Sequence, residues 1–334
     1  MNIIIPMAGM GKRMRPHTLT TPKPLLPIAG KPIVKRLVGD ILSTVNVKVN
    51  SISFIIGPHF GEAVEEMLQD VASSFDAKGI ICYQKETLGT AHAILTAKEQ
   101  LEGPVFIAFA DTLFKASFKI DLDKDAIIWT QKVEDPSAYG VVNLDESGRI
   151  TEFVEKPKEL ISDLAIIGVY YFKDGANLRK ELEYLVDNNI KEGGEFQITN
   201  AMENMLQKGL NFYTDQVEEW LDCGNKEVTL YTNQRILEIK KDLENLQDAT
   251  AEINNSIIIP PVYIGANVKI ENSIIGPHVS IEEGSKIQKS IIENSIIQEG
   301  SEVNGAHFKD AFLGEYSKYE KIAENINFGP YSVQ

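Results

Sequence analysis

Four cationic side chains lie within the first 25 residues of the chain, around two closely spaced glycines. The glycines are Gly9 and Gly11, they follow the apolar run at residues 3–5, and the cations are Lys12, Arg13, Arg15 and Lys23. Because glycine has no Cβ, backbone N–H groups in such a loop can approach an anion closely. The segment therefore predicts a buried strand followed by a loop that binds a polyphosphate.

Neither of the two common phosphate-binding loops fits this segment. The dinucleotide fingerprint G-x-G-x-x-G needs a third glycine where Met14 stands. The P-loop needs a glycine at Pro6 and a hydroxyl side chain at Arg13. What remains is Gly-x-Gly-x-Arg, followed ten residues after the arginine by Lys-Pro-Leu-Leu-Pro. These two motifs together resemble the sugar nucleotidyltransferase family, also called nucleoside-diphosphate-sugar pyrophosphorylases.

The resemblance implies a reaction, its substrates and its cofactor. A nucleoside triphosphate and a hexose 1-phosphate would give a nucleoside-diphosphate sugar and pyrophosphate, with Mg²⁺ as cofactor. The nucleotide would be bound by Ala8, Gly9, Gly11, Lys12 and Arg13. Arg13 and Lys23 would offset charge on the leaving pyrophosphate, and Lys23 would also contact the sugar phosphate. Lys12 departs from the small threonine of many relatives, so its part in the triphosphate site is the least well matched.

Short apolar runs alternate with helix-like stretches over residues 1–225, which is typical of a parallel α/β sheet. The helix-like stretches include residues 33–42 and 61–75, and the apolar runs are 3–5, 52–56, 80–83, 105–110, 126–130 and 165–172. We therefore predict a Rossmann-like domain with a mixed, mostly parallel sheet. Ligands of such sheets bind at the carboxyl ends of strands, so functional residues are expected just after these runs.

A candidate base-binding segment follows the third run. The amide of Gln84 can both donate to and accept from a pyrimidine edge, and a glycine just before a helix lets a flat base lie against the backbone. The stretch from Gln84 to Ala93 is similar to the family's Q-x-x-x-L-G-T-[AG]-x-A segment. By that resemblance, Gln84, Gly89 and Thr90 bind the base, whereas His92 is expected to be a helix surface residue.

Asp111 follows the fourth run and is a candidate metal ligand. A carboxylate at the end of a buried strand is costly unless it meets a cation, and Mg²⁺ prefers one or two carboxylates plus substrate phosphates. Its partner is expected in residues 220–224, Trp-Leu-Asp-Cys-Gly, which resemble the family's W-x-D-[TVI]-G. The resemblance implies that Asp111 and Asp222 share the metal and are catalytic.

Three later segments of the sequence are expected to bind the sugar phosphate. Sugars are bound by carboxylates that accept from hydroxyl pairs, and a sugar phosphate needs a nearby ammonium group. By resemblance to the family's E-K-P motif, Glu155 binds sugar hydroxyls and Lys156 binds the phosphate. The remaining sugar-site residues implied by the resemblance are Gly140, Gly168, Tyr170 and Glu195.

The composition and the repeat pattern of the sequence change after residue 225. Residues 226–250 have the composition of a connecting helix. Residues 251–334 repeat Asn-Ser-Ile-Ile, and aliphatics recur in steps of five or six at Ile258, Ile264, Ile270, Ile275, Ile281, Ile287, Ile292, Ile297 and Val303. This period is typical of hexapeptide coils, so we predict a parallel β-helix of three or four coils with glycines at its corners. The region resembles the left-handed β-helix of several sugar nucleotidyltransferases.

Composition excludes several functional classes. The 334 residues favour two domains, and the chain has no apolar run long enough to span a membrane. The net charge of −15 disfavours nucleic acid and anionic membranes as partners. With only two cysteines, Cys82 and Cys223, and no apolar leader before the first strand, we expect a cytoplasmic protein.

The resemblance favours dTTP or UTP with glucose 1-phosphate and leaves alternatives open. One is mannose-1-phosphate guanylyltransferase, and another is a bifunctional amino-sugar uridylyltransferase and acetyltransferase whose acyl-transfer base would be His278 or His307. A non-catalytic regulatory role is disfavoured because the expected catalytic residues are all present. A dense set of C-terminal aromatics also predicts a homo-oligomer, and it comprises Phe308, Phe312, Tyr316, Tyr319, Phe328 and Tyr331.

Overall fold

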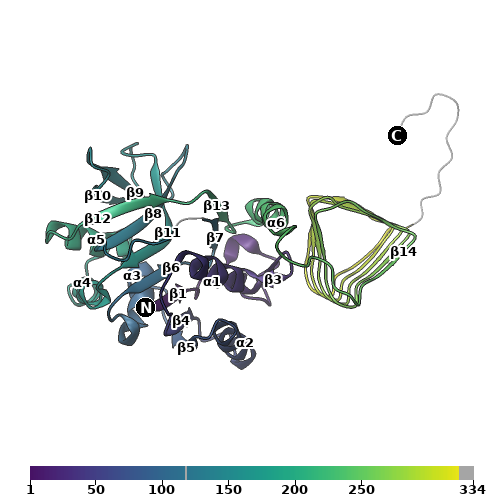
Figure 1. The fold of residues 1–334 in the computed structure, drawn as a ribbon, viewed down its shortest axis with the longest axis horizontal. Helices are drawn as coiled ribbons and strands as arrows, with labels where there is room; N and C mark the ends of the chain where they lie inside the picture. The colour runs from purple at the N-terminus through teal and green to yellow at the C-terminus, as the bar shows by residue number, and fades with distance from the viewer. Residues whose placement is uncertain (117–118, 323–334) are drawn as a thin grey trace. The chain divides into compact units, whose positions relative to one another are not determined.

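The computed structural model describes residues 1–116 and 119–322 and is shown in Figure 1. The chain forms two compact units. The first comprises Met1–Leu26 and Pro32–Asn225, and the second comprises Pro27–Lys31 together with the chain from Lys226 onward. Among the helices that the structure describes, none is long and apolar enough to cross a lipid bilayer.

The first unit is built on a nine-stranded mixed sheet, which confirms the predicted fold class. Its main strand order is β10-β9-β11-β6-β1-β4-β5, and β8 pairs with both β11 and β12. The parallel part consists of β1 (Asn2–Pro6), β4 (Ser51–Ile56), β5 (Lys78–Tyr83) and β6 (Val105–Ala108). The other strands are β8 (Ala126–Lys132), β9 (Gly140–Leu144), β10 (Ile150–Glu155), β11 (Leu164–Phe172) and β12 (Phe212–Gln216).

Helices cover this sheet so that its central strands are buried on both faces. Ile4 of β1 packs in a core cluster with Ile94, Leu182 and Met202, which come from three different helices. Ile3 and Ile5 point to the opposite face and are also fully buried. The helices are α1 (Ile33–Thr44), α2 (Glu62–Ser73), α3 (Thr90–Leu95), α4 (Gly175–Asp187) and α5 (Ile198–Gln207), with short 3₁₀ turns η1 (Lys12–Met14), η2 (Lys23–Leu25) and η3 (Lys98–Gln100).

A small two-stranded sheet extends the central part of the first unit. β7 (Thr112–Lys115) starts just after the end of β6 and pairs antiparallel with β13 (Glu219–Asp222). In this register Asp222 lies opposite Thr112, the residue after Asp111. Two acids that are far apart in the sequence are thereby brought to neighbouring backbone positions.

The second unit contains the predicted β-helix, formed by three parallel sheets whose strands follow one another in rotation, as in a left-handed β-helix. The first sheet holds β14 (Glu252–Asn254), β17 (Lys269–Glu271), β20 (Lys286–Gln288), β23 (Glu302–Asn304) and β26 (Lys318–Glu320). The second holds β15 (Ile257–Ile258), β18 (Ile274–Ile275), β21 (Ile291–Glu293) and β24 (His307–Lys309). The third holds β16 (Val262–Ile264), β19 (Val279–Ile281), β22 (Ile296–Ile297) and β25 (Phe312–Leu313).

The aliphatic ladder predicted from the sequence is the core of this β-helix. Ile264, Ile275 and Ile287 are at most 1% exposed and belong to one apolar cluster, against which Ile258 packs. The asparagines of the Asn-Ser-Ile-Ile repeats, Asn255 and Asn272 among them, adopt positive φ at the corners. Asparagine tolerates this left-handed conformation better than most residues, which explains why it recurs there.

The predicted connecting segment contains α6 (Lys226–Lys240), which contacts both the β-helix and a short hairpin from the N-terminal sequence. The hairpin is formed by β2 (Pro27–Ile28) and β3 (Lys31–Pro32). The Asn233 Oδ1 atom accepts hydrogen bonds from the Ala29 backbone N–H at 2.9 Å and from Ser280 Oγ at 2.8 Å. Since Asn233 is fully buried, this contact is an interior part of the second unit.

Candidate active site

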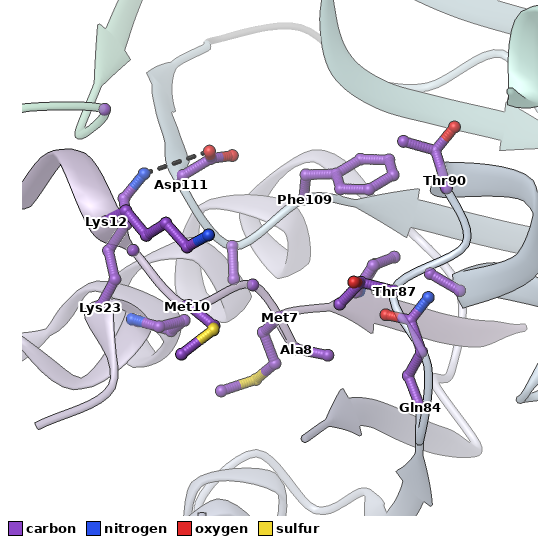
Figure 2. A pocket seen from close by; sticks show the side chains of 18 of the residues that line it. Met7, Ala8, Met10, Lys12, Lys23, Gln84, Thr87, Thr90, Phe109 and Asp111 are labelled. Carbon is purple, nitrogen blue, oxygen red and sulfur yellow. Dashed lines mark hydrogen bonds and ion pairs between the residues drawn. The ribbon is translucent and has the colours of Figure 1, made fainter. Parts of the chain in front are cut away.

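A cavity of about 510 Å³ lies at the carboxyl ends of β1, β5 and β6 (Figure 2). The sequence-predicted residues that line it are Ala8, Gly9, Gly11, Lys12, Arg13, Lys23, Gln84, Gly89, Thr90, Asp111 and Glu195. Figure 2 shows Lys12, Lys23 and Asp111 toward one end. Gln84, Thr87 and Thr90 lie toward the other end. The cavity thus has a charged end and an end lined with amide and hydroxyl groups.

Gly11 allows the two N-terminal motifs to pack closely. Its φ of +56° is in the left-handed region, and η1 starts directly after it. A Cβ at this position would lie 2.9 Å from the Cβ of Lys23 and 3.1 Å from a methyl carbon of Thr18. The Gly11 carbonyl also accepts a hydrogen bond from Thr18 Oγ1 at 2.8 Å. Glycine here therefore allows the predicted phosphate loop, residues 7–15, to pack against the start of the Lys-Pro-Leu-Leu-Pro motif.

Lys23 connects that motif to the end of β6. Its ammonium group lies 3.1 Å from Asp111 Oδ2, an ion pair drawn as a dashed line in Figure 2. The lysine side chain is 9% exposed, whereas the Asp111 side chain is 46% exposed. The cation is therefore largely withdrawn from water while the carboxylate keeps an open side toward the cavity.

Asp222 lies beside Asp111, as the sequence motif predicted. The Cys223 N–H donates to the Asp111 carbonyl at 2.9 Å, so the backbone fixes the two acids relative to each other. Loss of water raises the pKa of Asp222, the charge of Asp111 raises it further, and Lys23 and Arg13 partly offset this. Two neighbouring acids that repel each other fit a divalent cation. No cluster of three or more ligating His, Cys, Asp or Glu side chains occurs in residues 1–116 and 119–322, so substrate oxygens would have to complete the coordination.

The candidate base site is shaped by Gly89 and Gln84. Gly89 has a φ of +115°, and a Cβ there would overlap the backbone of Phe196. Gln84 is 7% exposed, and its Nε2 lies 3.4 Å from His92 Nδ1. Desolvation lowers the pKa of His92, an effect that the charge of Glu86 opposes, so the neutral ring can accept this hydrogen bond. His92, which the sequence analysis placed on the helix surface, contacts the amide expected to bind the base.

Among the expected sugar-site residues, Gly140, Glu155 and Lys156 form one group, and Gly168 lies beside a residue that lines the cavity. Glu155 Oε2 accepts from Thr199 Oγ1 at 3.0 Å, and Glu155 Oε1 lies 3.3 Å from the Lys156 ammonium. Gly140 leaves room for this carboxylate, because a Cβ there would lie 3.2 Å from Glu155 Oε2. Gly168 has a φ of +79° and lies against Phe109, which lines the cavity.

Tyr170 is placed differently from the other expected sugar-site residues. It belongs to the apolar core of the first unit and is 5% exposed, with its ring edge against Phe109. Burial raises the pKa of its phenol well above the usual range. Its role as a sugar contact stays a prediction.

Two further functional candidates, Gln197 and Thr199, lie at the start of α5 and were not predicted from the sequence. Gln197 is 4% exposed and hydrogen-bonds both Thr90 and Glu195, and Thr199 holds Glu155. Both residues stand in the stretch that supplies Glu195, Gly-Glu-Phe-Gln-Ile-Thr. Their amide and hydroxyl groups next to an expected sugar ligand are the signal that could have identified them.

Comparisons with known proteins agree with this arrangement. A family model described as nucleotidyl transferase matches residues 2–239. Low-salt glycan biosynthesis nucleotidyltransferase Agl11 of Haloferax volcanii is 31% identical over 256 residues, which cover 73% of this chain and 69% of that protein. Glucose-1-phosphate thymidylyltransferase of Streptomyces griseus is 28% identical over 336 residues, covering 94% of this chain and 91% of that protein.

Two further similarities are more limited. The match to bifunctional protein GlmU of Methanococcus maripaludis, 29% identical over 262 residues, covers 78% of this chain but 60% of that protein. A crystal structure of UDP-glucose pyrophosphorylase complexed with UDP-glucose has a TM-score of 0.59 at 23% identity, covering 71% of this chain and 98% of that chain. At this identity the structural likeness supports the fold alone. Because the family model spans the whole phosphate loop, both acids and the sheet between them, this chain belongs to the nucleotidyl transferase family.

Proposed function

We propose that this protein transfers a nucleotidyl group from a nucleoside triphosphate to a hexose 1-phosphate, releasing pyrophosphate. The observation that carries the proposal is the meeting of Lys23, Asp111 and Asp222 beside the phosphate loop. Lys23 and Asp111 form an ion pair at 3.1 Å, and the backbone bond from Cys223 places Asp222 next to them. Lys23 and Asp111 line one end of the cavity, and the other end has base-recognition chemistry.

In the proposed reaction an oxygen of the sugar phosphate attacks the α-phosphorus of the triphosphate in line. The new bond joins that oxygen to the α-phosphorus, the bond between the α-phosphorus and the bridging oxygen breaks, and pyrophosphate leaves with the electron pair. Arg13 and Lys23 stabilise the charge that develops on the pyrophosphate. The protein supplies orientation and charge, so no protein nucleophile is required.

Asp111 and Asp222 are the residues that would hold Mg²⁺. A bound Mg²⁺ would neutralise phosphate charge and align the reacting oxygens. Lys23 supports this arrangement because its largely buried ammonium, 3.1 Å from Asp111 Oδ2, restrains the orientation of that carboxylate. Burial first and then the charge of Asp111 raise the pKa of Asp222, and a bound cation would offset both effects.

The orientation of Gln84 supports a base with a ring N–H. With Nε2 directed to His92, the Oε1 atom remains to accept a hydrogen bond in the cavity. Uracil and thymine offer N3–H and guanine offers N1–H, whereas cytosine and adenine lack a ring N–H on that edge and could donate only from an exocyclic amino group. We therefore favour dTTP or UTP, with GTP as the alternative.

A substrate panel tests this choice. Each of the five triphosphates ATP, CTP, GTP, UTP and dTTP is paired with glucose, mannose and glucosamine 1-phosphates, and pyrophosphate release is measured. The highest kcat/KM is expected for UTP or dTTP with glucose 1-phosphate. A preference for ATP or CTP would contradict the role given to Gln84, and the absence of turnover with every pair would contradict the proposed function.

Acetyl transfer is a weaker candidate for the β-helix. His278 Nε2 lies 2.7 Å from Glu238 Oε1, so the ring makes a contact between the β-helix and α6 within the second unit. His307 starts β24 and is exposed. A thiol-release assay with acetyl-CoA and amino-sugar phosphates is expected to give no signal above background.

We also propose that the β-helix serves assembly into a homo-oligomer. Ile257, Ile274 and Ile291 are in register on one sheet, and Ile257 and Ile291 are 59% and 45% exposed. Tyr316 is 65% exposed, whereas Phe312 is buried; Phe328 and Tyr331 lie outside the described residues. A chain ending at Leu246 is expected to have a lower oligomeric order by light scattering and to retain some turnover. An unchanged number of subunits after truncation would contradict the assembly role.

The cytoplasm remains the proposed location of the protein. Cys82 and Cys223 are both free thiols, which supports a reducing environment.

A further inference from the structure

Gln197 lies between a residue proposed to bind the base and a residue proposed to bind the sugar. Its Oε1 accepts a hydrogen bond from Thr90 Oγ1 at 3.0 Å. Its Nε2 donates to Glu195 Oε2 at 3.2 Å. The side chain is 4% exposed, so water cannot readily replace either partner.

The chemistry of these groups fixes the direction of each hydrogen bond. An ionised Glu195 can only accept, so the amide must direct Nε2 toward it and Oε1 toward Thr90. The single hydroxyl proton of Thr90 is then donated to Gln197, and Thr90 Oγ1 accepts from the Ile198 N–H at 2.9 Å. Reversing the amide would place its oxygen against the carboxylate. The series of hydrogen bonds from Thr90 through Gln197 to Glu195 therefore has one favourable arrangement.

Backbone contacts make the two segments move together. The Phe196 N–H donates to the Leu88 carbonyl at 2.8 Å, and the Ala91 N–H donates to the Phe196 carbonyl at 2.9 Å. Gly89 lies against the Phe196 backbone so closely that no Cβ fits between them. Glu195 itself is exposed, so its carboxylate depends on Gln197 for a defined orientation.

We infer that Gln197 is a positioning residue that couples nucleotide binding to sugar-phosphate binding. The inference rests on the proposed function, because the substrate roles of Thr90 and Glu195 come from it. A nucleotide that contacts the segment of Thr90 restrains it, and Gln197 passes this restraint to Glu195, which then loses less conformational freedom when the sugar binds. The coupling is reciprocal: the sugar phosphate strengthens nucleotide binding by the same factor.

The test compares Gln197→Met with Gln207→Met. Methionine keeps the length of the side chain but removes both hydrogen bonds. Gln207 is a suitable control, because it is the last residue of the helix that Gln197 precedes, is exposed, and donates to Glu203 at 3.0 Å. Calorimetry measures the Kd of glucose 1-phosphate with and without the α,β-methylene analogue of UTP or dTTP, whichever triphosphate the substrate panel favours. That analogue cannot release pyrophosphate, so binding is measured without turnover.

In the native protein the analogue is expected to tighten sugar-phosphate binding by about 10-fold, within the usual range of such couplings. Gln207→Met should keep this factor, and Gln197→Met should reduce it to about 2-fold or less while the Kd of the nucleotide alone changes little. A full coupling factor in Gln197→Met, or none in the native protein, would overturn the inference. If the native protein shows no turnover with any substrate pair, the proposed function itself is wrong.

A second variant covers the case in which Gln197→Met does not fold. Gln197→Glu keeps an acceptor for Thr90 but places a second carboxylate against Glu195, so only the sugar side of the contact is broken. Sugar-phosphate affinity is expected to fall by about 10-fold, as for loss of one hydrogen bond to a charged group, with nucleotide affinity retained. Unchanged sugar affinity in this variant would contradict the inference independently.

Discussion

The two units use their polar side chains in opposite ways. In the β-helix, many partners come from a neighbouring coil: Lys269 pairs with Glu252, and Asn255 donates to Asn272, 17 residues away. At the candidate active site, Lys23 meets Asp111 across 88 residues, and Thr90 meets Gln197 across 107. Repetition satisfies the polar groups of the β-helix locally, whereas the site collects groups from distant segments and keeps Asp111 and Glu195 open to the cavity.

The residues with positive φ also differ between the two units. Positive φ values in the β-helix recur at equivalent corners, as at Asn255 and Asn272, so they serve the repeat. In the first unit, Gly11 and Gly89 adopt positive φ at single positions where another segment packs closely against the backbone. The difference predicts that substitutions at the candidate active site change kinetics, whereas substitutions in the β-helix core change stability.

The largest expected effect is that of Asp111→Asn. Removing this charge should lower kcat by at least about 10²-fold, as for loss of a group that stabilises transition-state charge. Asp163→Asn is the matched control, because Asp163 also pairs with a lysine, Lys132, but on the surface. Pyrophosphate release measures turnover, and circular dichroism checks the fold. Turnover near the native rate in Asp111→Asn would remove this residue from the catalytic machinery.

Glu155→Gln should act on one substrate only. The amide oxygen can still accept from Thr199, but the charge that binds sugar hydroxyls is lost. The KM for the hexose 1-phosphate is expected to rise by about 10-fold, with the KM for the triphosphate nearly constant. Glu152→Gln, on the same strand and bonded by Asn143, is the control. Equal changes in both KM values would show that Glu155 has a structural role instead.

Ile287→Ala should separate stability from activity. Ile287 is fully buried in the β-helix core, and truncation of such a residue costs about 2–5 kcal/mol of unfolding free energy. Turnover per folded molecule should stay near the native value. The control Ile259→Ala removes a residue of the β-helix that is 42% exposed and lies outside the isoleucine row proposed for assembly, and it should cost much less. Urea unfolding measures both, and similar losses for the two variants would contradict the assigned β-helix core.

The smallest effect is expected from Glu238→Gln. The hydrogen bond with His278, and then that with Lys241, lowers the pKa of Glu238. A lowered pKa contributes stability above the ordinary glutamate pKa of about 4.3, and that contribution is lost as the pH falls through the lowered value. The difference in Tm between native protein and variant should therefore shrink between about pH 6 and pH 3. A difference that stays constant over this range would show that the ion pair contributes nothing.

Features were predictable from the sequence where a short repeat or motif encodes them, and not where they depend on contacts between distant residues. The β-helix core was predictable because Ile264, Ile270 and Ile275 recur with a short period, and all three are buried. The loop after β1 was predicted from its motif to belong to the site, and its residues line the cavity. The contact between Thr90 and Gln197 could not be predicted, because neither periodicity nor spacing links side chains that are 107 residues apart.

The hairpin at residues 27–31 was missed for the same reason. It follows the Lys-Pro-Leu-Leu-Pro motif directly in sequence and shares the last proline of that motif, yet it belongs to the second unit. No feature of its own composition indicates that Asn233 and Ser280 lie beside it. The prediction divided the chain at residue 225 into two continuous segments. The structure instead assigns residues 27–31, which precede that border, to the second unit.

This hairpin limits how β-helices can be exchanged between relatives by recombination. A gene segment joined at Lys226 would bring its own Asn233 and Tyr263 but would meet residues 27–31 of another protein. A Cβ at Gly30 would overlap the Tyr263 ring, so this segment would not fit a protein that has a larger residue at position 30. Residues 30 and 263 should therefore change together during evolution, and exchanges that keep the hairpin with its β-helix should be the ones that survive.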